Sequence, residues 1–286
     1  MVAFRLLALI GLLLGFVALA APLQWLARRH SWQLARQVPV LFSRSLCWAL
    51  QIRTFVAGSQ SPLRPQLVVA NHVSWVDILV LGCRDPQSFL AKREVGNWPV
   101  FGTLARLQGT VFVDRQRLRC IPTVNMQMAR AMRAGNPMVL FAEATTSDGT
   151  RVKRFHSSHF AAARDLLAMD AAASAVVVQP VGIAYVRRNG LPLGRHGRSE
   201  VAWYGDMTLL PHLWRLLSGG PVDCHLVFVP VLAFRRGDDR KLISRQAEIA
   251  VRDAVSTLLS GQRLPDSLVS GPNQSAVSIL FETKTA

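Results

Sequence analysis

The chain has 286 residues, which is enough for one large domain or for a domain with an anchor. Half of the residues are hydrophobic, a share that is high for a soluble protein and low for a protein that crosses a membrane many times. The net charge of +16 predicts an anionic partner, and only four of the 33 basic residues are lysine.

The N-terminal segment Leu6–Leu26 is almost entirely apolar and, at 21 residues, is long enough to cross a bilayer as a helix. One arginine precedes it and four follow (Arg28, Arg29, Arg36 and Arg44), so a spanning helix would leave the rest of the chain in the cytoplasm. The segment also fits a cleavable signal peptide with Ala18-Leu19-Ala20 as its cleavage site. A second apolar stretch, Val38–Ile52, fits either a helix lying along the membrane or an amphipathic core helix.

Further along the chain, short apolar runs alternate with stretches of helical spacing. Strands are predicted over Gln66–Ala70, Ser88–Ala91, Thr110–Val113, Met138–Phe141, Ala175–Tyr185, Val201–Tyr204 and Cys224–Val229. Helices are predicted over Ser74–Leu81, Asn97–Leu107, Pro122–Ala134, His159–Met169 and Lys241–Leu259. This alternation predicts an α/β fold with a mixed, mostly parallel sheet flanked by helices. The expected divisions are a membrane anchor at 1–30, a globular domain at 31–262 and a tail at 263–286.

Polar clusters follow three of the predicted strands at their carboxyl ends, where sites in such sheets gather. In the first cluster, His72 comes directly after a buried strand and Asp77 follows five residues later. A near-neutral imidazole can accept a proton from an alcohol, and Asp77 could fix the tautomer of the ring. The alternative is that His72 only bonds the turn and that Asp77 is a solvated helix residue. Because no Gly-x-Ser-x-Gly motif occurs, the pair predicts direct activation of a substrate hydroxyl.

The other two clusters suit the binding of an anion or a hydroxyl. Arg115 stands at a strand end and could hold a phosphate through two parallel hydrogen bonds, or pair with a neighbouring acid. Glu143, followed by Thr145 and Thr146, could anchor Arg115 or bind a substrate hydroxyl, and the threonines could bind an anion. The alternative is an ordinary polar loop with an Asp148-Gly149 turn.

Several other classes of site are excluded by the sequence. It contains no Walker loop, no Gly-x-Gly-x-x-Gly and no His-Glu-x-x-His. The four cysteines are far apart and lack metal-ligand spacing, so we expect four buried thiols and no metal. The basic residues are spread along the chain without a recognisable module, so we expect no nucleic-acid partner.

Together, and in this order, the clusters resemble the lysophospholipid acyltransferase family, whose best-known members make phosphatidic acid. The family's first motif, Asn-His-x4-Asp, appears here as Asn71, His72 and Asp77, with Ser74 and Trp75 also typical. The further motifs appear as Lys92 before Pro99-Val100-Phe101-Gly102, as Gly109–Arg115, as Phe141–Thr145 and as Val178–Val181. The third motif is usually Phe-Pro-Glu-Gly-Thr, but Ala142 and Ala144 replace its Pro and Gly. If Ala144 must adopt a positive φ, strain of about 1 kcal/mol follows. Downstream, Phe155-His156 replaces the frequent Phe-Lys, which predicts a weakened or pH-dependent anion contact.

The resemblance implies that His72 is the general base and Asp77 its partner. It implies that Lys92, Arg115 and Glu143 bind the acceptor head group, with Asn71, Ser74, Thr145 and Thr146 as further substrate contacts. The implied reaction moves a fatty acyl group from acyl-CoA or acyl carrier protein to the free hydroxyl of a lysolipid, without a cofactor. The expected place is the inner membrane of a bacterium, with residues 31–262 as an acyltransferase domain that faces the cytoplasm.

The acceptor remains open between two lipids, with 1-acyl-glycerol-3-phosphate expected first. The segments Thr146–Gly149 and Trp203–Asp206 also resemble bacterial enzymes that acylate lyso-ornithine lipid. Two other functions compete with these: a non-catalytic lipid-binding protein, which the alanines of the third motif favour, and a secreted hydrolase behind a signal peptide. The lack of a nucleophile motif and of a disulfide pattern argues against the hydrolase.

Overall fold

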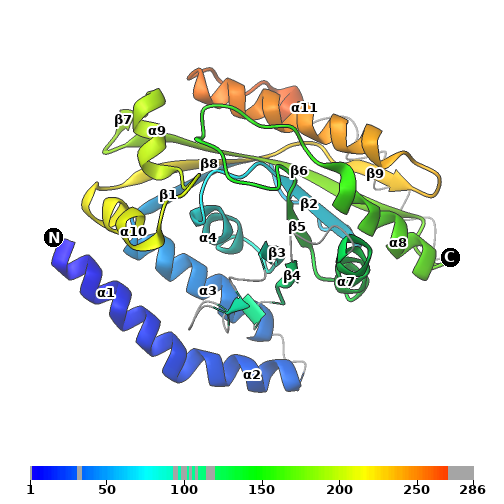
Figure 1. Cartoon of the computed structure of the whole chain (residues 1–286), viewed down its shortest axis with the longest axis horizontal. Coiled ribbons are helices and arrows are strands. Elements are labelled where there is room, and N and C mark those ends of the chain that lie inside the picture. Colours follow the sequence, from blue (N-terminus) through cyan, green and yellow to red (C-terminus); the bar gives the residue numbers. More distant parts are fainter. Residues whose placement is uncertain are drawn as a thin grey trace.

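A computed structural model describes residues 2–30, 34–92, 96–97, 102, 105–106, 109–113 and 120–269. Its strands are β1 Ile52–Ala57, β2 Gln66–Ala70, β3 Ser88–Lys92, β4 Val111–Val113, β5 Met138–Phe141, β6 Ala175–Arg188, β7 Leu191–Pro192, β8 Val222–Phe228 and β9 Leu232–Arg235. Within the described residues these strands form one nine-stranded sheet of order β1-β8-β6-β2-β5-β3-β4, with β7 and β9 paired to β6 (Figure 1). Strands β7, β8 and β9 run antiparallel to β6, and the other pairs are parallel. The predicted mixed, mostly parallel α/β fold is therefore confirmed.

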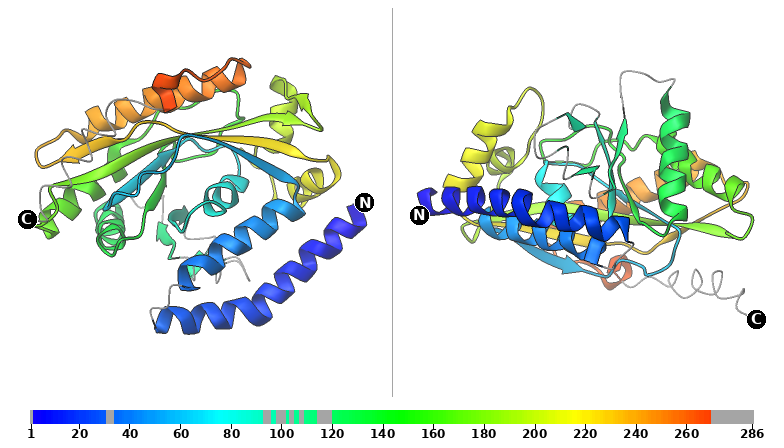
Figure 2. Two further views of the ribbon diagram at one scale, coloured as in Figure 1. Left: turned by 180° about the vertical axis from the view of Figure 1, so that it is seen from behind. Right: turned by 90° about the horizontal axis from the view of Figure 1, so that it is seen from below.

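Helices cover both faces of the sheet. They are α1 Val2–Gly15, η1 Phe16–Ala20, α2 Ala21–Arg29, α3 Leu34–Ala49, α4 Val76–Gly82, α7 Ile121–Arg133, η3 Ser157–Phe160, α8 Ala161–Met169, α9 Arg195–Val201, α10 Leu209–Ser218, α11 Arg240–Leu259 and α12 Asp266–Val269. Figures 1 and 2 show α11 on one face of the sheet and α3 and α4 on the other, with α1 and α2 outside α3. The sheet thus separates the N-terminal helices from α11.

Two neighbouring inner strands of the sheet, β2 and β5, have the predicted bounds, and every residue in both is buried. Successive side chains of a strand point to opposite faces of the sheet. Leu67 and Val69 accordingly pack in one hydrophobic cluster, and Val68 and Ala70 pack in the other. Burial on both faces explains why these strands are continuous apolar runs in the sequence.

The N-terminal helices form one run of helix from α1 through η1 to α2. Within its stretch Val2–Ala27, an 18-residue window has a mean hydropathy of 2.6 and is only 12% buried, so the helix is long and apolar enough to cross a membrane. The π-helical turn η1 ends two residues before Pro22, whose ring and missing N–H do not fit regular α-helical hydrogen bonding. The helix predicted over Leu6–Leu26 is confirmed, whereas its crossing of a membrane stays a prediction.

Some local predictions are wrong. The strand predicted over Val201–Tyr204 is absent, because α9 ends at Val201 and the following residues adopt no strand. Val201 and Ala202 are apolar because both are buried against the core, and burial alone does not distinguish a strand from a helix end. Three thiols are buried as predicted, but Cys120 is only half-buried. The helix predicted over Asn97–Leu107 lies almost wholly outside the described residues.

Candidate active site

The carboxyl ends of β2 and β5 lie side by side, because these strands are parallel neighbours. His72 stands two residues beyond the end of β2, and Glu143 stands two residues beyond the end of β5. A hydrogen bond of 3.1 Å from the Ala142 N–H to the Ala70 carbonyl continues the pairing past the strand ends. The first and third polar clusters of the sequence are therefore neighbours in space.

Asn71 fixes the start of the turn that carries His72. Its side chain donates to the Ile183 carbonyl (2.9 Å) and accepts from the Ile183 N–H (2.8 Å), so that a side chain extends the pairing of β2 with β6. The amide is buried and engaged at both ends. These bonds hold the start of the His72 turn in place, and the predicted contact of Asn71 with substrate stays a prediction.

His72 and Asp77 form the centre of the site. Asp77 lies in the first turn of α4, and its Oδ2 reaches back to accept from the N–H groups of Val73 (2.7 Å) and Ser74 (2.9 Å). The same oxygen lies 2.8 Å from Nδ1 of His72. The five-residue spacing spans a turn and the start of a helix, which folds the carboxylate back onto the ring. Asp77 is fully buried, so the alternative of a solvated helix residue is wrong.

Tyr185, which the sequence analysis missed, completes the environment of Asp77. Tyr185 lies near the carboxyl end of β6, and its hydroxyl donates to Oδ1 of Asp77 (2.7 Å). Burial, followed by the charge of Asp77, raises the pKa of Tyr185 well above its usual value, so the phenol stays protonated as a donor. Both oxygens of the Asp77 carboxylate are thus hydrogen-bonded away from water, an arrangement that compensates for its burial.

The ring of His72 is held in one orientation. It stacks on Phe141 with ring centroids 3.9 Å apart and planes 12° apart. Because Asp77 accepts hydrogen bonds from all its neighbours, we assign the imidazole proton to Nδ1, which leaves a lone pair on Nε2. Nε2 has no hydrogen-bond partner among the described residues, and the side chain is 13% exposed. An imidazole in this state can accept a proton from an alcohol.

The loop after β5 returns to the His72 turn. The Ser147 N–H donates to the His72 carbonyl (2.8 Å), and Lys153 Nζ donates to the Thr146 carbonyl (2.9 Å). Ala144 adopts a φ of 58°, in the left-handed region that costs an L residue about 1–2 kcal/mol. The positive φ that the glycine of the family motif suggested at this position is therefore present, with alanine bearing the strain.

Glu143 is buried without full hydrogen bonding. Its Oε1 accepts from the Lys153 N–H (3.0 Å), whereas Oε2 has no well-formed hydrogen bond to any described residue. Burial raises the pKa of Glu143 to about 8, although the backbone amides of Lys153 and His72 lower it. At neutral pH the carboxyl is therefore mostly protonated and can donate a hydrogen bond as well as accept one.

The other residues that were predicted to contact substrate differ in their burial and position. Thr145 is exposed and Thr146 half-buried on the loop after β5. Ser74 is fully buried, and its hydroxyl has no partner among the described residues. Lys92 is the last residue of β3, and Arg115 lies outside the part of the chain that the structure describes.

Comparisons with known proteins agree on acyl transfer. Residues 53–184 match the family model described as Acyltransferase. The chain is 39% identical over 243 residues to a lyso-ornithine lipid O-acyltransferase of Brucella abortus, which covers 85% of this chain and 90% of that protein. It is 32% identical over 201 residues to a 1-acyl-sn-glycerol-3-phosphate acyltransferase of Neisseria meningitidis, with 70% of this chain and 73% of that protein covered.

A solved structure has the same fold. The crystal structure of the 1-acyl-sn-glycerophosphate (LPA) acyltransferase PlsC from Thermotoga maritima matches with a TM-score of 0.62 at 19% identity, over 93% of this chain and 100% of that chain. The matched family model includes the strands and turns that carry His72, Asp77 and Glu143. Both relatives are named as acyltransferases, and both match over more than two thirds of their length at 30% identity or more. This chain therefore belongs to the lysophospholipid acyltransferase family and is an acyl-transferring enzyme.

Proposed function

We propose that this acyltransferase moves a fatty acyl group from a thioester donor to the free hydroxyl of a lyso-ornithine lipid, with His72 as the general base. The observation that carries the proposal is the 2.8 Å contact between Nδ1 of His72 and Oδ2 of Asp77, which leaves Nε2 free to take a proton. A base with an orienting carboxylate and no serine nucleophile suits direct attack by the substrate hydroxyl.

The reaction needs one proton to pass through His72. Nε2 removes the proton of the lipid hydroxyl while the oxygen attacks the thioester carbonyl carbon. A C–O bond forms, the C–S bond breaks, and the imidazolium returns the proton to the departing thiolate. Asp77 stays ionised and stabilises the positive ring, because backbone amides and the Tyr185 hydroxyl hold its carboxylate in place. Acyl-CoA and acyl carrier protein both present such a thioester and are both candidate donors.

Lyso-ornithine lipid is proposed ahead of 1-acyl-glycerol-3-phosphate, which the sequence alone favoured, because of the relatives' identities. The lyso-ornithine lipid O-acyltransferases of Brucella abortus and Rhizobium meliloti are 39% and 38% identical to this chain, against 32% for the Neisseria relative. Coverage is also greater, at 85% and 89% of this chain against 70%. We therefore place lyso-ornithine lipid first. The Neisseria relative keeps 1-acyl-glycerol-3-phosphate as the second candidate.

The residues around the dyad form the proposed acceptor site. A protonated Glu143 can donate to the carboxylate of an ornithine head group, and Thr145 and Thr146 lie on the same loop. Lys92 and Arg115 are proposed to hold the negative charge of the head group, as the resemblance implies. Ser74 and Asn71 support the turn, since both side chains are buried.

We place the enzyme at the bacterial inner membrane, with α1 to α2 as its anchor. The exposed, apolar Val2–Ala27 stretch supports this place. The larger number of arginines after the apolar segment favours a catalytic domain on the cytoplasmic side, where thioester donors are made.

The test is a transfer assay with purified full-length protein in detergent. Two donors with the same radiolabelled acyl chain are used, the acylated form of acyl carrier protein and acyl-CoA. Each donor is offered with lyso-ornithine lipid and with 1-acyl-glycerol-3-phosphate. The proposal predicts ornithine lipid as the main product, whereas faster formation of phosphatidic acid would support the second acceptor. Lack of transfer to every lysolipid would support the non-catalytic alternative. Release of free fatty acid without an acceptor would support a hydrolase.

A further inference from the structure

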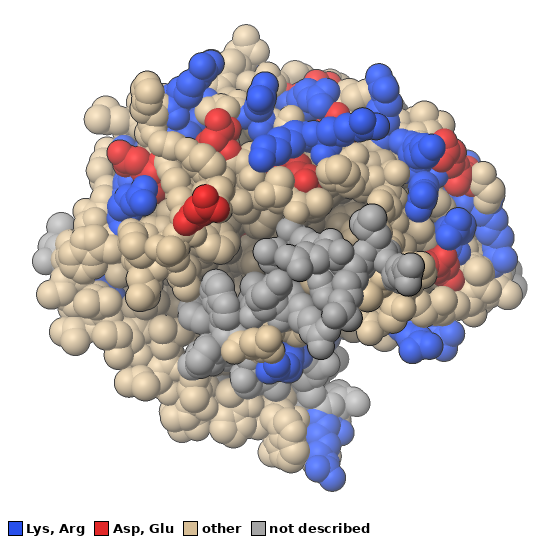
Figure 3. Space-filling view, viewed as in Figure 1, with Lys and Arg blue, Asp and Glu red and all other residues tan. Residues whose placement is uncertain are grey.

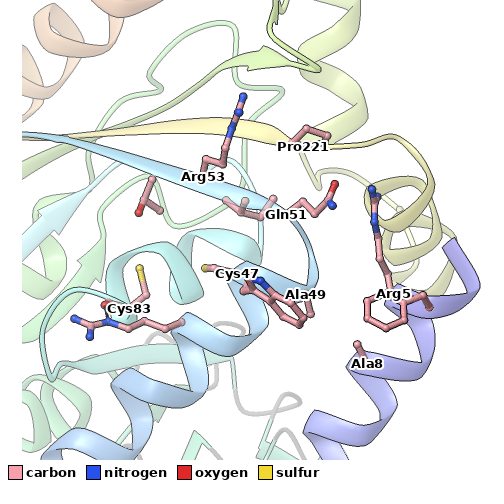
Figure 4. Close-up of a pocket in the computed structure, with 13 residues that line it drawn as sticks. Arg5, Ala8, Cys47, Ala49, Gln51, Arg53, Cys83 and Pro221 are labelled. Atoms are coloured by element: carbon pink, nitrogen blue, oxygen red, sulfur yellow. Dashed lines mark hydrogen bonds between the residues drawn. The ribbon is translucent and has the colours of Figure 1, made fainter. Parts of the chain in front are cut away.

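Helix α10 connects the N-terminal helix with the turn that carries His72. Nη1 of Arg5 in α1 donates to the Leu217 carbonyl at the end of α10 (2.8 Å), and Figure 4 shows Arg5 reaching from α1 toward that helix. From the catalytic turn, Nε1–H of Trp75 donates to Nδ1 of His212 in α10 (3.0 Å). His212 is buried and donates from Nε2 to the Val201 carbonyl (3.1 Å), so its ring is neutral and fixed.

The opposite face of α10 is apolar and exposed. Leu210 is 74% exposed and Trp214, one helical turn later, is 54% exposed. Pro211 is exposed beside them, and Arg215 lies at the flank of this face. Two large apolar side chains that share an exposed helix face indicate a contact surface more strongly than single exposed residues do.

Helix α1 packs beside α10 and exposes apolar side chains of its own. The exposed large apolar residues of α1, α3 and α10 include Phe4, Leu7, Ile10, Leu14, Leu41, Trp48, Leu210 and Trp214. A cavity of about 810 Å³ is lined by residues of α1 and α3, among them Phe4 and Trp48. Figure 4 shows Ala8 of α1 and Cys47 and Ala49 of α3 in its lining. Figure 3 shows charged side chains over the upper and right-hand parts and few over the lower left, where α1 lies.

We propose that α10 is a second membrane-contact helix, whose Leu210 and Trp214 enter the lipid–water interface beside α1. A lipid surface fits this face because the face adjoins a helix apolar enough to cross a bilayer, and because tryptophan favours the interface. Arg215 at the flank can reach lipid phosphates. The inference rests on the proposed function, which places the acceptor in the membrane. Through His212 and Trp75, the contact positions the His72 turn relative to the bilayer that holds the acceptor.

The first test does not depend on turnover. Full-length protein is reconstituted into vesicles of phosphatidylethanolamine and phosphatidylglycerol whose chains carry bromine at shallow or deep positions. The emission of Trp214 is the difference between the native protein and Trp214→Phe. We expect shallow bromine to quench this emission more strongly than deep bromine. Emission that no bromine position quenches would overturn the proposal.

The second test compares two pairs of surface substitutions. Leu210→Ser with Trp214→Ser removes the apolar face of α10. Leu242→Ser with Ile249→Ser removes the matched exposed pair on α11 (55% and 45% exposed), across the sheet. We expect the α10 pair to lower kcat/KM about tenfold for lysolipid in vesicles, which corresponds to about 1.4 kcal/mol. Short-chain, monomeric lysolipid should react at the native rate, and the α11 pair should leave both rates unchanged.

Two kinetic outcomes would count against a membrane contact. One is a native rate for the α10 pair on vesicles, and the other is an equal loss on vesicles and on monomeric lysolipid. If the native enzyme acylates no lysolipid at all, the proposed function fails, and the quenching measurement alone decides the role of α10.

Discussion

The turn after β2 and the loop after β5 are neighbours built in opposite ways. In the turn after β2, the carboxylate of Asp77 is fully buried and both of its oxygens accept hydrogen bonds. In the loop after β5, Glu143 has a carboxyl oxygen without a well-formed hydrogen bond, and Ala144 holds a strained φ of 58°. The side chains of the His72–Asp77 pair are thus held in place by hydrogen bonds, whereas the loop retains, among the described residues, an unused hydrogen-bond acceptor, as the proposed roles of a fixed general base and an acceptor-binding loop require.

The largest expected effect is the fall in kcat when the proposed general base is removed. His72→Ala should lower kcat by about 10²–10⁴, because general-base catalysis contributes that much, while the melting temperature stays close to native. His196→Ala, at an exposed histidine on α9, is the matched control and should keep the native rate. Turnover of His72→Ala near the native level, measured by product formation, would reject the mechanism.

The next effect concerns the support of Asp77. Tyr185→Phe leaves Oδ1 of Asp77 without its donor, so we expect a loss of about 1–3 kcal/mol in the free energy of unfolding. The rate should fall less than in His72→Ala, because the contact between Asp77 and His72 remains. Tyr204→Phe changes the only other tyrosine of the chain and should alter neither quantity. Equal free energies of unfolding for the two variants in urea would show that the hydrogen bond from Tyr185 to Asp77 does not stabilise the fold.

Glu143 gives a pH signature to the loop. Its pKa is raised from an ordinary value of 4.5 to about 8, so between these values the folded protein retains a proton that the unfolded chain has lost. The stability contributed by this group is therefore greatest below about pH 4.5 and falls as the pH rises toward 8. Glu143→Gln should flatten that part of the stability curve, as measured by unfolding at several pH values. An unchanged slope would mean that Glu143 is ionised in the fold.

The smallest expected effect is relief of backbone strain. Ala144→Gly should raise the free energy of unfolding by up to about 1 kcal/mol, because glycine adopts a positive φ without a steric penalty. Ala131→Gly in α7 is the control and should cost about 0.5–1 kcal/mol. A loss of stability in Ala144→Gly would show that the loop conformation is not strained.

The sequence predicts the parts of the site that are local in the chain. Strands β2 and β5 are continuous apolar runs with polar ends, and the spacing of His72 and Asp77 brings them together through one turn and one helix start. Tyr185 could not be predicted in this way, since it reaches Asp77 from 108 residues away and only through the pairing of β2 with β6. Once the structure shows that Asn71 bonds Ile183, the position of Tyr185 near Asp77 can be understood, because Tyr185 lies two residues beyond Ile183 on the same strand.

The proposed mechanism requires that Nε2 of His72 carries the lone pair that accepts the proton of the lipid hydroxyl. Nitrogen-15 NMR of imidazole-labelled protein in micelles tests this directly, with the His72 signals identified by their loss in His72→Ala. We predict that Nδ1 of His72 is protonated and coupled across the hydrogen bond to Asp77, and that Nε2 shows the shift of an unprotonated nitrogen. A proton on Nε2 with a bare Nδ1 in the neutral ring would contradict the account.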